Sequence, residues 1–135
     1  MAQAFAKLYK VELRGIAMKY LFVLNDPPYG TERSYNGLRL ARELLKDATQ
    51  DNAVRVFLVA DAAACAKSGQ KVPMSYYHVE SFLKMIVRAG GEIGVCSTGM
   101  DTRGIADAEL VDGTRRSTLA EWAEWTQWAD TVLVF

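Results

Sequence analysis

The segment KYLFVLN, residues 19–25, is a short and nearly continuous apolar run that stops at Asp26-Pro27-Pro28. A run of this kind is typical of a strand buried in a parallel sheet, which is covered on both faces. Similar strand-length segments occur at residues 54–60 (VRVFLVA), 92–96 and 131–135 (TVLVF). The sequence therefore predicts a strand at each of these places, with segments long enough for helices between them.

Amphipathic helices are expected between the strands. Apolar residues recur at helical spacing over residues 35–48 and 79–86, and the pair Gly90-Gly91 supplies a stop after the second of these helices. Thr118, with Glu121 three positions later, has the form of a capping box that opens a last helix. Strands that alternate with helices need right-handed crossovers, which produce a parallel sheet with helices on both faces. The predicted fold is a Rossmann-like or flavodoxin-like α/β three-layer sandwich with a mostly parallel sheet.

Length and charge limit the class of protein. The chain has 135 residues, which suits one domain, and its 16 basic and 16 acidic residues cancel. No charged run favours nucleic acid or a membrane surface as a partner, and no apolar run reaches the roughly 20 residues that a bilayer helix needs. We expect a cytoplasmic protein with a single domain over residues 18–135. Residues 1–17 are interpreted as an N-terminal extension, native or vector-derived, without fixed structure.

The sequence favours neither a metal nor a cofactor. His78 is the single histidine, and Cys65 and Cys96 are the two cysteines, which is too few ligands for a zinc site. Glycine-rich phosphate-binding motifs are absent from the sequence. Without a recognisable secretory signal, both thiols are expected to be free in a reducing compartment.

Cys96 is the strongest candidate for a reactive group, because ligands bind beyond the carboxyl ends of parallel strands. It ends the third predicted strand, and Ser97 to Arg103 is expected to turn into a short helix. A thiol at a helix start lies near unpaired N–H groups, which favour the thiolate. Arg103 either returns toward Cys96 or pairs with Asp101. The alternative for Cys96 is a packing role as a small hydrophobic residue at a strand end.

Other residues have both a structural and a functional interpretation. Cys65 lies in an alanine-rich stretch that favours packing, with a resolving thiol as the alternative. His78 is expected to be a helix-start residue rather than a general base near Cys96. Asp26 is expected to cap the following helix, to line the crevice, or both. The last helix carries a stripe that predicts core packing and, for one member, an oligomer contact: Trp122, Trp125 and Trp128.

Residues 94–117, GVCSTGMDTRGIADAELVDGTRRS, resemble the signature segment of the DsrE/DsrF-like family, which includes the YchN-like proteins and the sulfur-relay Dsr and Tus subunits. The resemblance extends over nearly the whole of residues 18–135. It is strongest around Cys96, Arg103 and Gly104.

This resemblance implies a Rossmann-like sandwich that forms symmetric homo-oligomers, often trimers or hexamers. In several members a cysteine at the position of Cys96 carries a persulfide between partner proteins. Many YchN-like relatives have a second cysteine three residues later, where this chain has Gly99, so a local dithiol cycle is not expected. The residues assigned to the site beside Cys96, by the resemblance and by their loop positions, are Arg103, Gly104, Asp26, Tyr29, Ser97 and Thr98.

Two functions follow from these features. The first is a sulfur-relay or sulfurtransferase-like protein that carries a persulfide on Cys96, with a sulfur donor and an acceptor protein as partners. The second is a non-catalytic oligomeric subunit that binds or scaffolds, with a small-ligand crevice, because other family members lack the reactive cysteine. A flavodoxin-like cofactor binder is a weaker third idea, since only the architecture suggests it.

Overall fold

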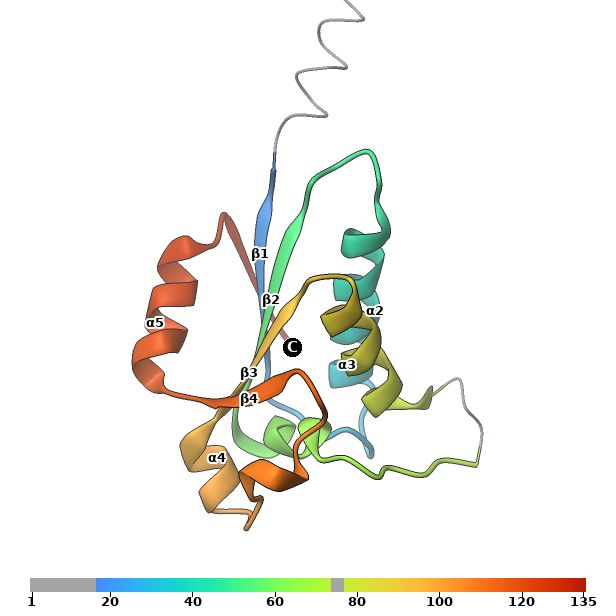
Figure 1. The fold of residues 1–135 in the computed structure, drawn as a ribbon, viewed down its shortest axis with the longest axis vertical. Helices are drawn as coiled ribbons and strands as arrows, with labels where there is room; N and C mark the ends of the chain where they lie inside the picture. The colour runs from blue at the N-terminus through green and yellow to red at the C-terminus, as the bar shows by residue number, and fades with distance from the viewer. Residues whose placement is uncertain (1–16, 74–76) are drawn as a thin grey trace, which may run out of the picture.

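The structure is a computed structural model that describes residues 17–73 and 77–135. Its centre is a sheet in the order β4-β3-β2-β1-β5, and every neighbouring pair of strands is parallel (Figure 1). All the segments predicted to be strands are strands. The strands are β1 (Lys19–Leu24), β2 (Ala53–Leu58), β3 (Glu92–Cys96), β4 (Thr114–Ser117) and β5 (Thr131–Val134).

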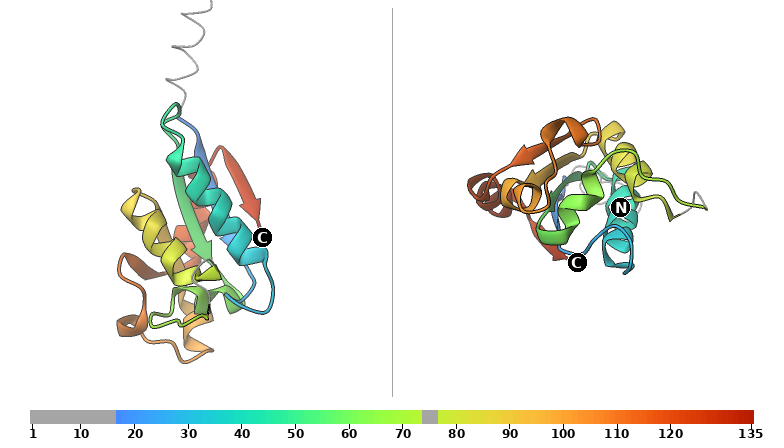
Figure 2. Two further views of the ribbon diagram at one scale, coloured as in Figure 1. Left: turned by 90° about the vertical axis from the view of Figure 1, so that its right-hand side faces the viewer. Right: turned by 90° about the horizontal axis from the view of Figure 1, so that it is seen from below.

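Helices cover both faces of the sheet, which confirms the predicted α/β three-layer sandwich. α2 (Arg33–Lys46) and α3 (Val79–Arg88) lie on one face, and α5 (Leu119–Trp128) lies on the other (Figures 1 and 2). Shorter elements gather where the strands end: the 3₁₀-helices η1 (Ala60–Ala66) and η3 (Asp107–Glu109), and α4 (Ser97–Asp101). This end of the sheet is the edge at which parallel α/β folds bind their ligands.

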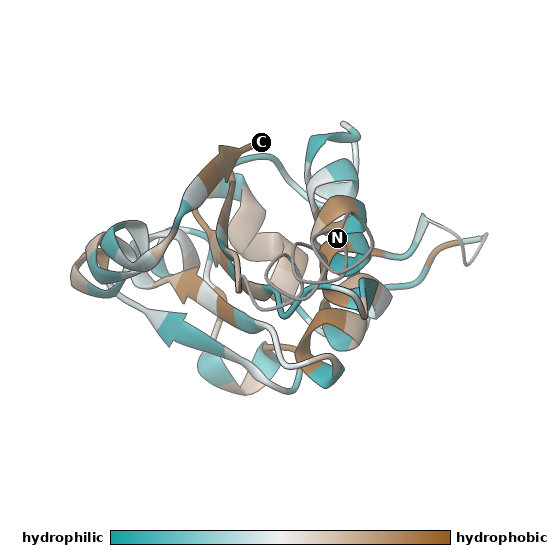
Figure 3. Ribbon diagram, turned by 90° about the horizontal axis from the view of Figure 1, so that it is seen from above, coloured by the Kyte–Doolittle hydropathy of each residue, from teal (hydrophilic) through white to brown (hydrophobic). Residues whose placement is uncertain are grey.

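Each face of the sheet has its own hydrophobic core, because alternate side chains of a strand point to opposite faces. Figure 3 shows hydrophobic residues along the strands between the helical layers. The larger cluster lies under α2 and α3 and includes Phe22, Val56 and Leu83. The smaller cluster lies under α5 and consists of Leu21, Val23, Phe57, Val59 and Trp125.

β4 is a strand that the sequence pattern does not predict. Its residues, TRRS, are polar, and it lies at the edge of the sheet, where β3 is its one neighbouring strand within the described residues. Polar side chains are tolerated there because an edge strand is only half covered. The register pairs Cys96 with Ser117, so β4 extends the sheet beside the candidate site.

Of two expected helix caps, the one at α5 is partly present and the one at α2 is absent. The Oγ1 atom of Thr118 accepts a hydrogen bond from the backbone N–H of Glu121 at 3.1 Å, as in a capping box. The Glu121 carboxylate, however, accepts hydrogen bonds from Ser117 and Arg115. Asp26 was expected to cap α2, but Glu32 holds the N-cap position and no side chain caps that helix. Asp26 nevertheless contacts the first turn of α2: its carbonyl accepts a hydrogen bond from the Ser34 hydroxyl at 2.6 Å, and its carboxylate lies 3.8 Å from Nε of Arg33.

None of the helices in the described part of the chain has the length and apolar character needed to cross a membrane. The predicted N-terminal extension lies outside the described residues, except for Ala17.

Candidate functional site

Cys96 is the last residue of β3 and the N-cap of α4. Its side chain is half-buried and packs against the cluster under α5, as Trp122 does. The position follows from the strand: Ile93 and Val95 point into the larger cluster, so Gly94 and Cys96 face α5. The thiol therefore lies at the carboxyl end of the sheet, on the less heavily covered face.

Arg103 pairs with a residue that the sequence did not single out. Its Nε and Nη2 atoms donate to Oδ1 of Asp61 at 3.0 and 2.7 Å, and its Nη1 atom donates to the carbonyl of Gly99 at 3.1 Å. The alternative pairing with Asp101 is therefore wrong. Asp61 lies in η1 and Arg103 follows α4, so this ion pair joins these two short helical segments at the carboxyl edge.

Arg116 is a second arginine that holds the segment after Cys96. Its Nη1 atom donates to Oδ1 of Asp101 at 2.9 Å and to the carbonyl of Ser97 at 3.4 Å, and its Nε atom donates to Oδ1 of Asp107 at 2.6 Å. These contacts hold Arg116 in its charged form, which raises its pKa. The sequence places Arg116 within the signature segment but gives no sign that it reaches back to α4.

The backbone of α4 depends on two glycines. Gly104 has a φ of +64°, in the left-handed region where glycine is favoured, and this turn lets the N–H of Ile105 donate to the carbonyl of Met100 at 2.9 Å. Gly99 is buried against η1: a Cβ atom at this position would lie 3.3 Å from the carbonyl oxygen of Ala60 and 3.4 Å from the Cβ of Ala63. A cysteine at position 99 would therefore crowd η1. Gly99 has no side chain, and this permits the close contact between α4 and η1.

Ser97 and Thr98 form the first turn of α4. The carbonyl of Thr98 accepts hydrogen bonds from the N–H and the Oγ1 of Thr102, at 3.0 and 2.9 Å. With the contact from Arg116 to Ser97, the turn that follows Cys96 is fixed along its length. Cys96, Ser97, Thr98, Arg103 and Gly104 belong to one continuous stretch, which the structure folds into α4 and the turn after it.

Asp26 and Tyr29 lie in the loop after β1 and have other partners. Asp26 accepts a hydrogen bond from the Thr31 hydroxyl at 2.9 Å. Tyr29 packs against the cluster under α2 and α3, and its hydroxyl donates to Gln70 at 2.7 Å. Burial raises the pKa of Tyr29. Tyr29 therefore lies on the face of the sheet opposite to the one that Cys96 faces.

Cys65 is fully buried in η1, within the cluster under α2 and α3. Its Sγ atom donates to the carbonyl of Asp26 at 3.7 Å. Burial raises the pKa of this thiol to about 12, so it stays protonated near neutral pH. Because Cys65 and Cys96 belong to clusters on opposite faces of the sheet, Cys65 has the packing role that was favoured for it.

His78 is the N-cap of α3, in agreement with the helix-start interpretation. Its Nε2 atom lies 2.9 Å from the carbonyl of Gln70, and its Nδ1 atom lies 2.7 Å from the hydroxyl of Ser81. The His78 ring thus links the backbone at Gln70 to Ser81 of α3.

The comparisons with known proteins decide the family. The model of the DsrE/DsrF-like family matches residues 18–135. The chain belongs to this family. It is 38% identical to protein YchN of Escherichia coli strain K12 over 87% of this chain and 98% of that protein. It is 27% identical to an uncharacterized protein of Methanocaldococcus jannaschii, over 87% of this chain and the whole of that protein.

A solved structure agrees with this membership. The crystal structure of the E. coli ychN protein matches with a TM-score of 0.80 at 37% identity, over 87% of this chain and 99% of that chain. The strand order and the layers described above are therefore those of a known DsrE/DsrF-like fold.

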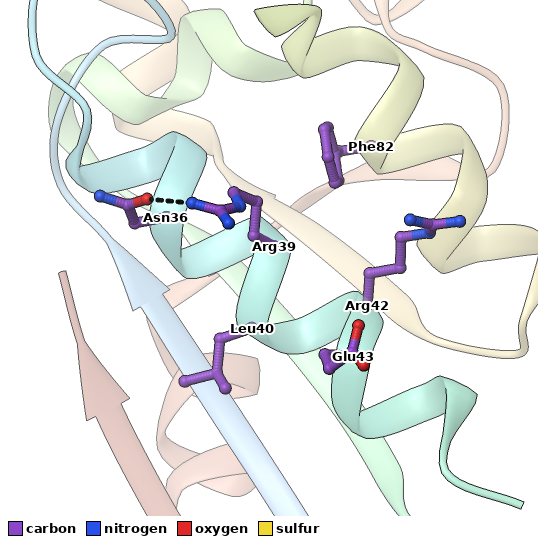
Figure 4. Close-up of a pocket in the computed structure, with 6 residues that line it drawn as sticks. All are labelled: Asn36, Arg39, Leu40, Arg42, Glu43 and Phe82. Atoms are coloured by element: carbon purple, nitrogen blue, oxygen red, sulfur yellow. Dashed lines mark hydrogen bonds between the residues drawn. The ribbon is translucent and has the colours of Figure 1, made fainter. Parts of the chain in front are cut away.

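One surface hollow of this DsrE/DsrF-like chain, of about 480 Å³, is formed by α2 and Phe82 of α3, on the face opposite to α5 and away from Cys96 (Figure 4). Arg39, Arg42 and Glu43 give it charges of both signs. Within the described residues no group of His, Cys, Asp and Glu side chains is arranged to hold a metal ion. The candidate site thus consists of a half-buried thiol, at Cys96, on a turn held by hydrogen bonds.

Proposed function

We propose that this chain is a sulfur-relay protein that carries sulfane sulfur as a persulfide on Cys96. The observation that supports the proposal is the contrast between the two thiols. Cys96 is half-buried at the carboxyl edge of the sheet, whereas Cys65 is fully buried and has a raised pKa. A thiol must be accessible and able to ionise in order to attack sulfur.

The transfer step needs no oxidant. The Cys96 thiol gives up its proton, and its sulfur attacks the outer sulfur of a persulfide donor, R–S–SH. A new S–S bond forms at Cys96 while the S–S bond of the donor breaks, and the donor leaves as R–SH after it takes up a proton. The products are Cys96–S–SH and R–SH. Attack by the thiol of an acceptor protein on the outer sulfur then returns Cys96 to its starting state.

The remaining site residues shape this centre. Ser97, Thr98 and Gly104 define the turn that presents Cys96, and Arg103 fixes this turn to the loop after β2 through Asp61. Asp26 and Tyr29 shape the neighbouring loop after β1. With Gly99 in place of a second cysteine, the carrier works with one thiol and hands its sulfur on to another protein.

Intact-mass spectrometry after incubation with a persulfide donor tests the proposal. We expect wild type to gain the mass of one or more sulfur atoms, Cys96→Ser to gain none, and Cys65→Ser to gain as much as wild type. Removal of the added sulfur by dithiothreitol shows that the adduct is a persulfide. If wild type takes up no sulfur, or if Cys96→Ser loads equally well, the carrier function is wrong. The non-catalytic oligomeric subunit would then be favoured.

The proposal implies partner proteins and a reducing cellular compartment. Sulfur donor and acceptor proteins must reach the carboxyl edge of the sheet, and a reducing cytoplasm keeps Cys96 free between transfers. We also infer a homo-oligomer, a trimer or a hexamer. Trp122 and Trp128 are half-buried on α5 and are the members of the tryptophan stripe that remain available for such a contact.

A further inference from the structure

The side chain of Gln70 reaches from the segment after η1 to the loop after β1. Its Oε1 atom accepts a hydrogen bond from the hydroxyl of Tyr29 at 2.7 Å. Its Nε2 atom donates to the carbonyls of Cys65 and Lys67, at 2.9 and 2.8 Å. A primary carboxamide has two N–H hydrogens and one carbonyl oxygen, so each of these finds a partner here. We call the Tyr29 hydroxyl and the two carbonyls the carboxamide site.

The hydroxyl of Tyr29 is oriented by a second hydrogen bond. The backbone N–H of Val79 donates to its oxygen at 3.3 Å, which leaves the hydroxyl hydrogen for Gln70. Burial raises the pKa of Tyr29, so the hydroxyl keeps this hydrogen near neutral pH. The carboxamide site therefore presents one donor and two acceptors, the complement of a primary amide. A carboxylate has no hydrogen for the two carbonyls, so the site disfavours it.

The backbone of Gln70 is held separately from its side chain. Its N–H donates to Oε1 of Glu80 at 3.0 Å, and its carbonyl lies 2.9 Å from Nε2 of His78. The side chain of Glu80 is only 8% exposed and also pairs with Lys84, at 2.8 Å. Because α3 anchors the backbone, the side chain of Gln70 can leave the carboxamide site by rotation about its own bonds.

The carboxamide site joins two elements that are far apart in the sequence. Tyr29 belongs to the loop after β1, whereas Cys65 belongs to η1. The Sγ atom of Cys65 also contacts this loop, at 3.7 Å from the carbonyl of Asp26, and Cys65 is 0% exposed. Access of a reagent to the Cys65 thiol therefore reports the separation of the loop from η1.

We propose that these groups form a binding site for a primary carboxamide, which Gln70 occupies as an internal ligand until an external amide displaces it. Gln70 thus closes the site and holds the loop after β1 against η1. The inference is independent of persulfide transfer, because Tyr29 and Cys65 lie in the cluster under α2 and α3, whereas Cys96 packs against the cluster under α5.

The rate of modification of Cys65 by N-ethylmaleimide tests the inference, with peptide mass spectrometry to assign the modified cysteine. We expect Gln70→Ala to raise this rate by about tenfold or more, because hydrogen bonds between the loop and η1 are lost. Acetamide, the group that the substitution removes, should slow the reaction again. Sodium acetate, compared with sodium chloride at the same ionic strength, should not.

The rescue by acetamide separates this mechanism from a general loosening of the fold. Gln70→Glu keeps the size of the side chain and should also raise the rate, without rescue by acetamide. Gln127→Ala removes an exposed carboxamide from α5 and serves as the matched control, with the rate of wild type under every condition. An unchanged rate in Gln70→Ala, or equal effects of acetamide and acetate, would overturn the inference. No sulfur donor is present, so failure of persulfide loading at Cys96 leaves this result unaffected.

Two larger probes in Gln70→Ala distinguish the sources of the amide. Free glutamine carries charged amino and carboxylate groups beside its carboxamide, whereas a glycine-glutamine-glycine peptide blocked at both ends carries neither. Protection of Cys65 by the peptide alone supports a site for a polypeptide partner. Protection by free glutamine alone supports the same site with the amino acid as its ligand.

Discussion

Cys65 and Cys96 show how the surroundings of one residue type decide its chemistry. Cys65 is 0% exposed and lies among the alanines of η1. Ionisation of its thiol would therefore place a charge in an apolar core. Cys96 ends β3 at the carboxyl edge of the sheet, is half-buried, and has Ser117 of β4 as its register partner. The difference in burial between the two thiols comes from their positions in the fold: Cys65 lies within the cluster under α2 and α3, and Cys96 lies at the end of β3.

The raised pKa of Cys65 predicts an alkaline loss of stability. Burial raises the pKa from an ordinary value of 9.0 to about 12, so between these values the unfolded chain loses this proton and the folded chain keeps it. The free energy of unfolding should therefore fall by up to about 1.4 kcal/mol per pH unit as the pH rises above about 9. Urea unfolding of wild type and Cys65→Ala at pH values from about 8 to about 10 measures this slope.

Cys65→Ala should be less stable than wild type below pH 9, because it leaves a cavity, but its stability should depend less on pH above that value. Val79→Ala makes a cavity in the same cluster without removing a thiol, so it should keep the slope of wild type. Equal slopes in Cys65→Ala and Val79→Ala would contradict the prediction.

At the scale of elements, the contact between α5 and the sheet depends on the absence of a side chain at Gly94. A Cβ atom there would lie 3.1 Å from the Cβ of Ser117, 3.2 Å from Cη2 of Trp125 and 3.3 Å from Cδ2 of Phe57. Trp125 is only 4% exposed and closes the small core by packing its edge against the ring of Phe57. The helix therefore lies as close to β3 as a glycine allows.

Gly94→Ala should lower the free energy of unfolding by about 1 to 3 kcal/mol, because the added methyl group forces Trp125 and Ser117 outward. Chemical denaturation followed by tryptophan fluorescence measures this change. Ala120→Val adds bulk on the exposed side of α5 and should cost less than about 1 kcal/mol. Equal losses in the two variants would show that the close contact at Gly94 is unimportant.

At the scale of the whole molecule, ion pairs join the loops of the carboxyl edge to one another. Arg103 links α4 to the loop after β2, and Arg116 links β4 to both ends of the segment after α4. The side chains of Arg103 and Asp61 are 32% and 63% exposed, so their pairing contributes little to global stability. Their effect should be local, on the opening of the edge that presents Cys96.

Arg103→Ala should accelerate amide hydrogen exchange over residues 99–105 while lowering the free energy of unfolding by less than about 1 kcal/mol. Exchange followed by mass spectrometry, together with a denaturant titration, measures both quantities. Lys46→Ala removes another exposed ion pair, with Glu43 on α2, and should leave exchange at the edge unchanged. Unaltered exchange over residues 99–105 in Arg103→Ala would show that this arginine does not hold the edge.

Local pattern was enough to predict the central strands, the helices on both faces and the place of Cys96. Residues 19–24 and 92–96 are largely apolar because these strands are buried on both faces of the sheet. Such burial can be recognised from the residues of the strand alone. The resemblance to the DsrE/DsrF-like family then pointed to the segment around Cys96, Arg103 and Gly104.

Contacts between distant residues were decided by the tertiary structure alone. β4 is a polar edge strand without a periodic signal, and Arg103 meets Asp61 across 42 positions of the chain. A long guanidinium side chain can reach many carboxylates, and the sequence holds no information on which of them the fold brings near. For the same reason the sequence placed a thiol at the end of β3, and only the pairing of β3 with β4 made Ser117 the register partner of Cys96.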